Sequence, residues 1–231
     1  MRKKIGFYDY TVVLTYLGFF IALFGIMRTM DGKYWDAMVC LMLSGVCDMF
    51  DGAVAATKRN RTTEEKRFGI QIDSLSDLVS FGIFPALFVY QLSNHHPLIG
   101  VISMGYALCA LIRLAYYNVL EEARQKRLEE KEQRMGDGGS LEERVEKEEN
   151  KVYLGLPVTV IAITLPALFF FYDGSMLHRP LWFGTLLFGM AVAFVTPFEI
   201  QKPKAMGKIV LILLGALEAF GMAYLAFVGA M

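Results

Sequence analysis

The chain has 231 residues, of which 55% are hydrophobic and 20% charged, and its mean hydropathy is +0.42. A soluble domain averages about 45–50% apolar and about 25% charged residues, so disorder, a disulfide scaffold and a soluble single-core enzyme are disfavoured. The net charge is zero, which gives no reason to expect a nucleic acid partner.

The hydrophobic residues gather in seven long runs, separated by short polar joins and one charged loop. A helix that spans a bilayer needs about 20 mostly apolar residues. We therefore predict an all-α, polytopic integral membrane protein with about seven transmembrane helices, in one membrane-embedded domain over residues 1–231. The predicted spans cover residues 11–29, 34–57, 70–92, 98–120, 153–173, 180–198 and 207–230.

Basic residues fall mainly on one side of this predicted topology. If the N-terminus is cytoplasmic, nineteen Lys and Arg residues lie on the cytoplasmic side and three on the opposite side. One more, Arg113, lies inside the fourth span. Because cytoplasmic loops are enriched in Lys and Arg, we predict a multi-pass protein of the cell membrane with a cytoplasmic N-terminus.

The 121–152 loop is the one long polar segment between the predicted spans. Its first part, residues 121–135, continues the fourth span as a polar helix, and the glycine-rich residues 136–139 end that helix. Ser140 and Glu143 have the spacing of a capping box that starts a second helix. The pattern predicts a charged cytoplasmic helical hairpin.

Four aspartates lie in the second and third apolar runs: Asp48, Asp51, Asp73 and Asp77. An ionised carboxylate in a spanning helix costs about 2.5–3.5 kcal/mol, so their charge must be compensated. The first two are three residues apart and the last two are four apart, which places each pair on one helix face. Both pairs lie at matched distances from the basic loop between the helices, so we expect them to meet.

Four facing carboxylates form a hard-oxygen site that suits Mg²⁺ or Mn²⁺, as one ion or two. A pocket at this level, open to the cytoplasm, implies a phosphate-bearing ligand of mixed polarity. Two other interpretations stay open, namely polar residues that hold helices together and the acidic site of an ion-coupled transporter. Small residues that leave room for a ligand flank the aspartates: Gly52, Ala53, Ala55, Ala56 and Gly69.

The pattern D-x2-D-G-x2-A followed by G-x3-D-x3-D resembles the signature of the CDP-alcohol phosphotransferases. The matching residues are Asp48, Asp51, Gly52, Ala55, Gly69, Asp73 and Asp77. The segment around Ser80-Phe81-Gly82 resembles the branch of that family that uses serine. The chain departs from the signature after Ala55, where Ala56 replaces an arginine and a longer loop leads to Gly69. Lys58, Arg59 and Arg61 in that loop are candidates for the missing positive charge.

The resemblance implies a reaction and a role for each matching residue. CDP-diacylglycerol and L-serine would give phosphatidylserine and CMP, while sibling enzymes use glycerol 3-phosphate or inositol phosphate as the acceptor. Asp48, Asp51 and Asp73 would bind the metal, and Asp77 would bind metal and act as general base on the serine hydroxyl. Homodimers are common in the family. Residues expected to contact the substrates are Gly52, Ala55, Gly69, Lys58, Arg59, Ser80, Arg113 and Asn118.

Arg113 has two interpretations. It either extends its side chain to the membrane surface or binds a lipid phosphate or the serine carboxylate, for which a guanidinium offers bidentate geometry. Asn118, on the same predicted helix, is placed to hydrogen-bond the acceptor.

Overall fold

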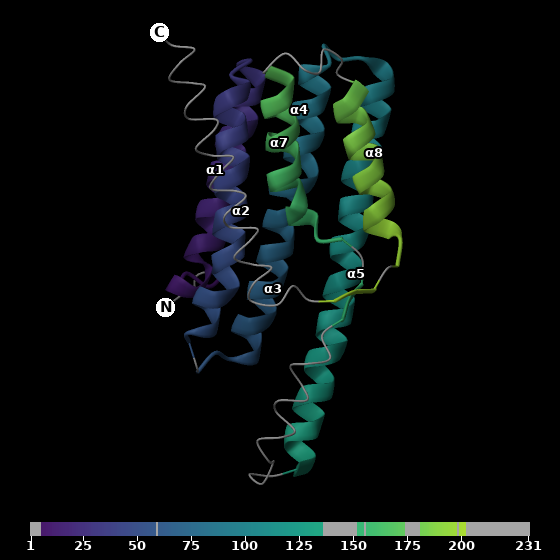
Figure 1. Cartoon of the computed structure of the whole chain (residues 1–231). Coiled ribbons are helices and arrows are strands. Elements are labelled where there is room, and N and C mark those ends of the chain that lie inside the picture. The colour runs from purple at the N-terminus through teal and green to yellow at the C-terminus, as the bar shows by residue number, and fades with distance from the viewer. Residues whose placement is uncertain are drawn as a thin grey trace.

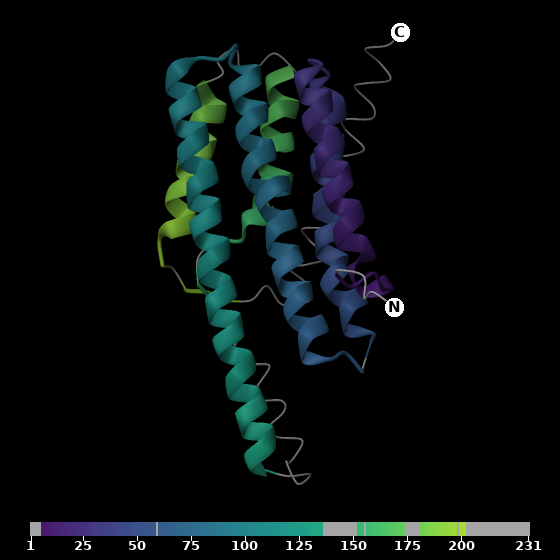
Figure 2. The same ribbon diagram turned by 180° about the vertical axis from the view of Figure 1, so that it is seen from behind.

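The computed structural model describes residues 6–58, 60–135, 152–154, 156–173, 181–197 and 199–201. Its helices run roughly along one common axis and form an elongated bundle (Figures 1 and 2). One helix, α5, extends well beyond the others at the lower end of the view. The bundle agrees with the predicted helical class.

Helices α1 (Tyr10–Met30) and α2 (Tyr34–Ala56) form an antiparallel pair along their whole length (Figure 1). The Asp9 side chain caps the start of α1 by accepting a hydrogen bond from the Thr11 backbone N–H at 3.0 Å. Small residues allow close packing: a Cβ on Gly25 would lie 2.5 Å from the Phe84 ring and 2.8 Å from the Cys40 Cβ. Both helices match their predicted spans to within one residue at each end.

The third span is a continuous helical segment made of α3 (Thr63–Asp77), the π-helical turn η1 (Leu78–Ile83) and α4 (Phe84–Leu92). It begins at Thr63, whereas the apolar run predicted a start at residue 70. The reason is a capping box, in which the Thr62 side chain and the Glu65 side chain each bond the other residue's backbone N–H. A polar first turn therefore extends the helix beyond its apolar part.

Helix α5 (Pro97–Met135) is 39 residues long and joins the fourth span to the polar segment that follows it. The predicted continuation of the span through residues 121–135 is confirmed. The second helix of the predicted hairpin lies outside the described residues.

The C-terminal described part is shorter and less regular than its apolar runs predicted. Residues 153–173 were predicted as one span, but this part contains β1 (Val152–Leu154), the 3₁₀ turn η3 (Val158–Val160) and α7 (Ile161–Asp173). The next helix, α8 (Leu181–Val195), is followed by β2 (Glu199–Gln201), which pairs with β1 in antiparallel register. Because β1 pairs with β2, the residues just before η3 and those just after α8 lie side by side.

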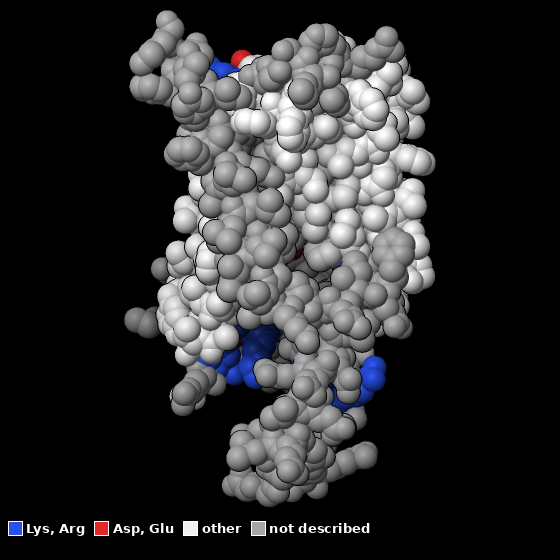
Figure 3. Space-filling view, in the orientation of Figure 1, with Lys and Arg blue, Asp and Glu red and all other residues white. Residues whose placement is uncertain are grey.

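Four helical segments are long and apolar enough to cross a membrane: Tyr10–Met30, Tyr34–Ala56, Thr63–Leu92 and Pro97–Arg127. The run at 207–230 lies outside the described residues, so a total of seven spans stays a prediction. Large aromatic side chains fill the core between these helices, including Phe81, Phe84, Phe88 and Tyr106. In Figure 3 the described flank of the bundle is mostly uncharged, and Lys and Arg side chains show at its lower end.

Candidate functional site

The four aspartates converge from two neighbouring helices. Asp48 and Asp51 lie in the last three turns of α2, and Asp73 and Asp77 lie in the last two turns of α3. The Asp48 side chain lies against that of Asp77, and the Asp51 side chain lies against that of Asp73. The residues therefore meet as two pairs at successive heights, which is the arrangement that their spacing predicts.

Three of these carboxylates are close enough to share one ion. One oxygen each from Asp48, Asp73 and Asp77 lies within 4.8 Å of the other two. The Oδ1 atom of Asp73 is buried and has no hydrogen-bond partner within the described structure. A buried carboxylate oxygen without a partner is costly, and an all-carboxylate donor set suits a hard divalent cation. The residues present therefore fit Mg²⁺ or Mn²⁺.

Asp51 has a further partner from the first helix. Thr15 Oγ1 donates to Asp51 Oδ2 at 3.0 Å, and Asp51 is only 9% exposed. The Thr15 carbonyl in turn accepts a hydrogen bond from Ser76 Oγ at 3.5 Å. Thr15 of α1 thus contacts an aspartate of α2 and, on α3, the serine next to Asp77, so that three helices hold the site together.

The aspartates line an open cavity between α1, α2, α3 and η1, whose empty space of about 180 Å³ includes its mouth to the surroundings. Ser80 from η1 lines the same cavity, beside Asp77. The part of this cavity that the centre of a water-sized sphere can reach is only about 10 Å³, which is about the space that one water needs, so the cavity has room for an ion or a water but not for a larger molecule.

The small residues of the motif differ in their surroundings. A Cβ built on Gly52 would meet nothing within 4 Å, so the backbone there borders open space. Ala55, one turn further along α2, is partly buried. Gly69 on α3 is covered by a side chain, because a Cβ there would lie 2.6 Å from Arg61 Nη2.

The cations of the loop between α2 and α3 also differ. Lys58 Nζ lies 2.5 Å from Asp9 Oδ2 and 3.0 Å from Glu65 Oε1, so its charge is already compensated. The hydrogen bonds that Lys58 donates to Asp9 and Glu65 raise the pKa of its ammonium, and Lys58 together with Thr11 lowers the pKa of Asp9 to about 2. Lys58 therefore ties the start of α1 to the start of α3. Arg59 lies outside the described residues.

Helix α5 forms a further wall beside α3. Asn118 Oδ1 accepts a hydrogen bond from Ser74 Oγ at 2.7 Å, and Arg113 is 9% exposed. Because α3 and α5 run antiparallel (Figure 1), the contact at Asn118 places Arg113, five residues earlier, about level with the start of η1. Because the Arg113 side chain is buried at this depth, its burial favours a role inside the bundle over extension to the membrane surface.

Thr15 is a residue of the site that the sequence did not predict. A threonine in an apolar helix gives no sign of an acidic partner on another helix, because its hydroxyl more often bonds the backbone of its own preceding turn. The π-helical turn after Asp77 was also missed, and it lies directly beside the acidic residues, where such turns are often found.

The model of the CDP-alcohol phosphatidyltransferase family matches residues 11–196. The chain is similar to an archaetidylserine synthase of Methanothermobacter thermautotrophicus, with 26% identity over 183 residues, which are 79% of this chain and 65% of that protein. It is also similar to a CDP-diacylglycerol–serine O-phosphatidyltransferase of Saccharomyces cerevisiae, with 34% identity over 123 residues, or 52% of this chain and 43% of that protein.

A protein of the same name from Bacillus subtilis is 28% identical over 109 residues, which are 46% of this chain and 59% of that protein. The matched part of this chain thus spans less than two thirds of the length of each of these relatives. The family model, in contrast, covers most of the chain and includes every one of the four aspartates. On this evidence the chain belongs to the CDP-alcohol phosphatidyltransferase family.

Proposed function

We propose that this chain transfers a phosphatidyl group from CDP-diacylglycerol to L-serine, which gives phosphatidylserine and CMP. The observation that carries the proposal is the group of three carboxylate oxygens within 4.8 Å of one another, inside helices long enough to cross a membrane. Relatives named for serine transfer support serine as the acceptor. Phosphoryl transfer depends mainly on positioning and on compensation of negative charge, which such a site provides.

Asp48, Asp51, Asp73 and Asp77 would hold the metal, as one Mg²⁺ or Mn²⁺ ion or two. When bound, the metal supplies compensation for the negative charge of the diphosphate. The side chains themselves have a second task, because their mutual contacts and the hydrogen bond from Thr15 fix the directions of their oxygens. Carboxylate oxygens with fixed directions would hold CDP-diacylglycerol in a single orientation for the reaction.

We place the donor beside the cavity, at the end of the bundle that carries the loop between α2 and α3. The open backbone at Gly52, with Ala55 and Gly69 nearby, would border the cytidine diphosphate. Of the two loop cations expected to contact the donor, Lys58 is already compensated by Asp9 and Glu65, so Arg59 would favour the approach of an anionic donor. The diacylglycerol tails would stay in the membrane beside the helices.

We place the acceptor serine between Asp77 and helix α5. Asp77 would take the proton of the serine hydroxyl, whose oxygen then forms a bond to the lipid-linked phosphorus while the bond to CMP breaks. The buried Arg113 would bind the serine carboxylate through two parallel hydrogen bonds. Ser80 and Asn118 would position the serine by hydrogen bonds.

We further propose that the reaction faces the cytoplasm, in the cell membrane. The aspartates lie in the part of α2 and α3 nearest to their connecting loop, and that loop is rich in Lys and Arg. Cytoplasmic loops carry such an excess.

Release of CMP by the detergent-solubilised full chain tests this function. The protein is supplied with CDP-diacylglycerol and Mg²⁺ or Mn²⁺, and with serine, glycerol 3-phosphate or inositol phosphate singly. We expect CMP and phosphatidylserine with serine and much slower release with the two phosphate-bearing acceptors. Faster release with either of those acceptors would assign the chain to a sibling activity. Absence of CMP release with all three acceptors would contradict the enzyme assignment and favour an ion-coupled transporter.

A further inference from the structure

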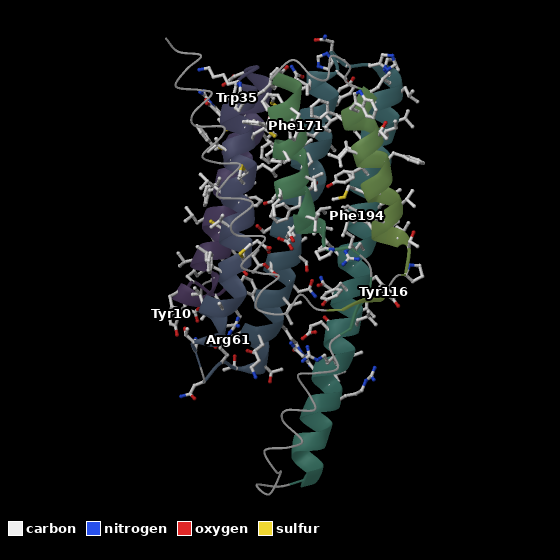
Figure 4. The ribbon with its side chains drawn as sticks, in the orientation of Figure 1. Tyr10, Trp35, Arg61, Tyr116, Phe171 and Phe194 are labelled. Atoms are coloured by element: carbon white, nitrogen blue, oxygen red, sulfur yellow. The ribbon has the colours of Figure 1, made fainter. Side chains whose placement is uncertain are left out.

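Arg61, in the loop between α2 and α3, lies against the backbone of α3 instead of pointing into solvent. Its Nη2 atom donates to the Glu65 carbonyl at 3.2 Å and occupies the space where a side chain at Gly69 would begin, 2.6 Å from the position of a Cβ. Figure 4 shows Arg61 at the lower end of these two helices. Only glycine at position 69 leaves room for a guanidinium at this place.

The hydrogen-bonding capacity of this guanidinium is incompletely used. The Nε–H of Arg61 is buried and has no hydrogen-bond partner among the described residues. Arg61 also forms no ion pair within the described part of the chain, whereas Lys58, three residues earlier, contacts two carboxylates. A buried N–H donor on a permanent cation is costly without an acceptor, so the arrangement calls for an anionic group from outside the chain.

The position of Arg61 relative to the aspartates indicates which anion would fit. Gly69, Asp73 and Asp77 follow one another at intervals of four residues, so they lie on one face of α3. One interval corresponds to about 6 Å along the helix. A ligand with two linked phosphates can therefore reach the aspartates with one phosphate and Arg61 with the other. A guanidinium matches phosphate oxygens through a bidentate geometry.

Ala56, at the end of α2, also points to Arg61. The sequence pattern that this chain resembles has an arginine at the end of α2, and this chain has Ala56, whose side chain cannot bind an anion. Of the three loop cations that remain as replacements, Lys58 is compensated by Asp9 and Glu65. Arg61 combines a fixed position against α3 with a charge that no carboxylate compensates within the described residues.

We propose that Arg61, held in place by Gly69, binds the diphosphate of the nucleotide donor, and that this contact replaces the one lost with Ala56. The inference rests on the proposed function for the identity of the nucleotide. Beyond the proposed function, it assigns a phosphate contact to one residue of the loop and explains Gly69 as the residue that leaves space for the guanidinium.

The test is equilibrium binding of CDP and of cytidine to the solubilised full chain, together with the rate of CMP release. The two ligands differ only in the diphosphate. In Arg61→Ala we expect CDP to bind about 10- to 100-fold more weakly, which is the effect of losing a hydrogen bond between charged groups, while cytidine binds as before. The KM for CDP-diacylglycerol should rise with it, and kcat should change less. Arg67→Ala is the matched control, because Arg67 is an exposed arginine of α3.

Two more variants separate this contact from a purely structural role. Arg61→Lys keeps the charge without the planar group and should recover part of the preference for CDP over cytidine. Gly69→Ala should displace the guanidinium and lower that preference, and the double variant Arg61→Ala with Gly69→Ala should be no worse than the stronger single variant.

The outcomes distinguish this inference from the proposed function. Unchanged CDP binding in Arg61→Ala, or an equal loss in Arg67→Ala, would overturn the inference even if the chain produces phosphatidylserine. The same result is expected if Arg61 instead binds the phosphate of a bulk lipid. If CDP binding depends on Arg61 but no acceptor leads to CMP release, the phosphate contact stands and the proposed reaction fails.

Discussion

Asp77 is the residue at which the proposed chemistry can be tested most directly. It contacts Asp48, lines the cavity beside Ser80 and immediately precedes the π-helical turn. Asp77→Asn keeps the size of the side chain but cannot accept the serine proton. We expect kcat to fall by about 10²–10⁴-fold, the usual contribution of a positioned general base, while CDP binding stays largely intact. CMP release at saturating substrates measures the first effect and equilibrium binding of CDP the second.

Asp31→Asn is the control for this variant, since Asp31 is an exposed aspartate in the turn between α1 and α2, at the far end of the bundle. It should have the same kcat as the unchanged chain. An Asp77→Asn variant with a near-normal kcat would remove Asp77 from the role of base. Loss of CDP binding in that variant would instead assign Asp77 mainly to holding the donor.

At the scale of elements, η1 is the feature that shapes the site and that apolar patterning cannot reveal. A π-helical turn shifts the backbone hydrogen bonds by one residue relative to an α-helix. In this turn the Phe81 carbonyl accepts a hydrogen bond from the Tyr106 hydroxyl of α5 at 2.6 Å, and Tyr106 is fully buried. We infer that this bond holds η1 in place, and with it the adjacent Asp77 and Ser80.

Tyr106→Phe removes only this hydroxyl and leaves a buried carbonyl without its partner. We expect a loss of about 1–3 kcal/mol in the free energy of unfolding, measured as a lower thermal midpoint in detergent, together with a reduced kcat. Tyr116→Phe on the same helix is the control, because Tyr116 is 58% exposed. If Tyr106→Phe has the stability and the kcat of the control, the bond to Phe81 does not position the site.

The elements also show what spacing can predict and what it cannot. Intervals of three and four residues were enough to place Asp48 opposite Asp77 and Asp51 opposite Asp73, because helix geometry leaves little freedom once two helices are antiparallel neighbours. The start of α3 was misplaced because hydropathy ignores polar first turns, although the pattern from Thr62 to Glu65 is a recognisable capping box. The pairing of β1 with β2 joins segments too distant in sequence for local patterns to predict.

At the scale of the whole molecule, the charge asymmetry of the sequence and the geometry of the bundle favour the same orientation. The loop between α2 and α3 and the extended part of α5 lie at one end of the bundle, and the turns that follow α1 and α4 lie at the other (Figure 1). Nine of the twelve Lys and Arg residues of the described part belong to the first end. The aspartates lie nearer to this end, which the positive-inside rule assigns to the cytoplasm.

Labelling of single cysteines in sealed right-side-out membrane vesicles tests this orientation. Two exposed residues mark the two ends of the bundle: Asn60 in the loop between α2 and α3, and His96 in the turn before α5. The background is a variant in which the native Cys40, Cys47 and Cys109 are replaced by alanine. A membrane-impermeant maleimide should label His96→Cys in intact vesicles and label Asn60→Cys only after the vesicles are opened with detergent.

The variants must also retain CMP release, which shows that the labelled protein is the folded one. The reverse labelling pattern would place the loop cations and the aspartates on the outer side of the membrane. A CDP-diacylglycerol molecule whose nucleotide headgroup faces the cytoplasm could not reach them there. In that case the donor would have to lie with its headgroup on the outer side of the membrane. The proposed orientation would then fail, although the arrangement of the four carboxylates would be unaffected.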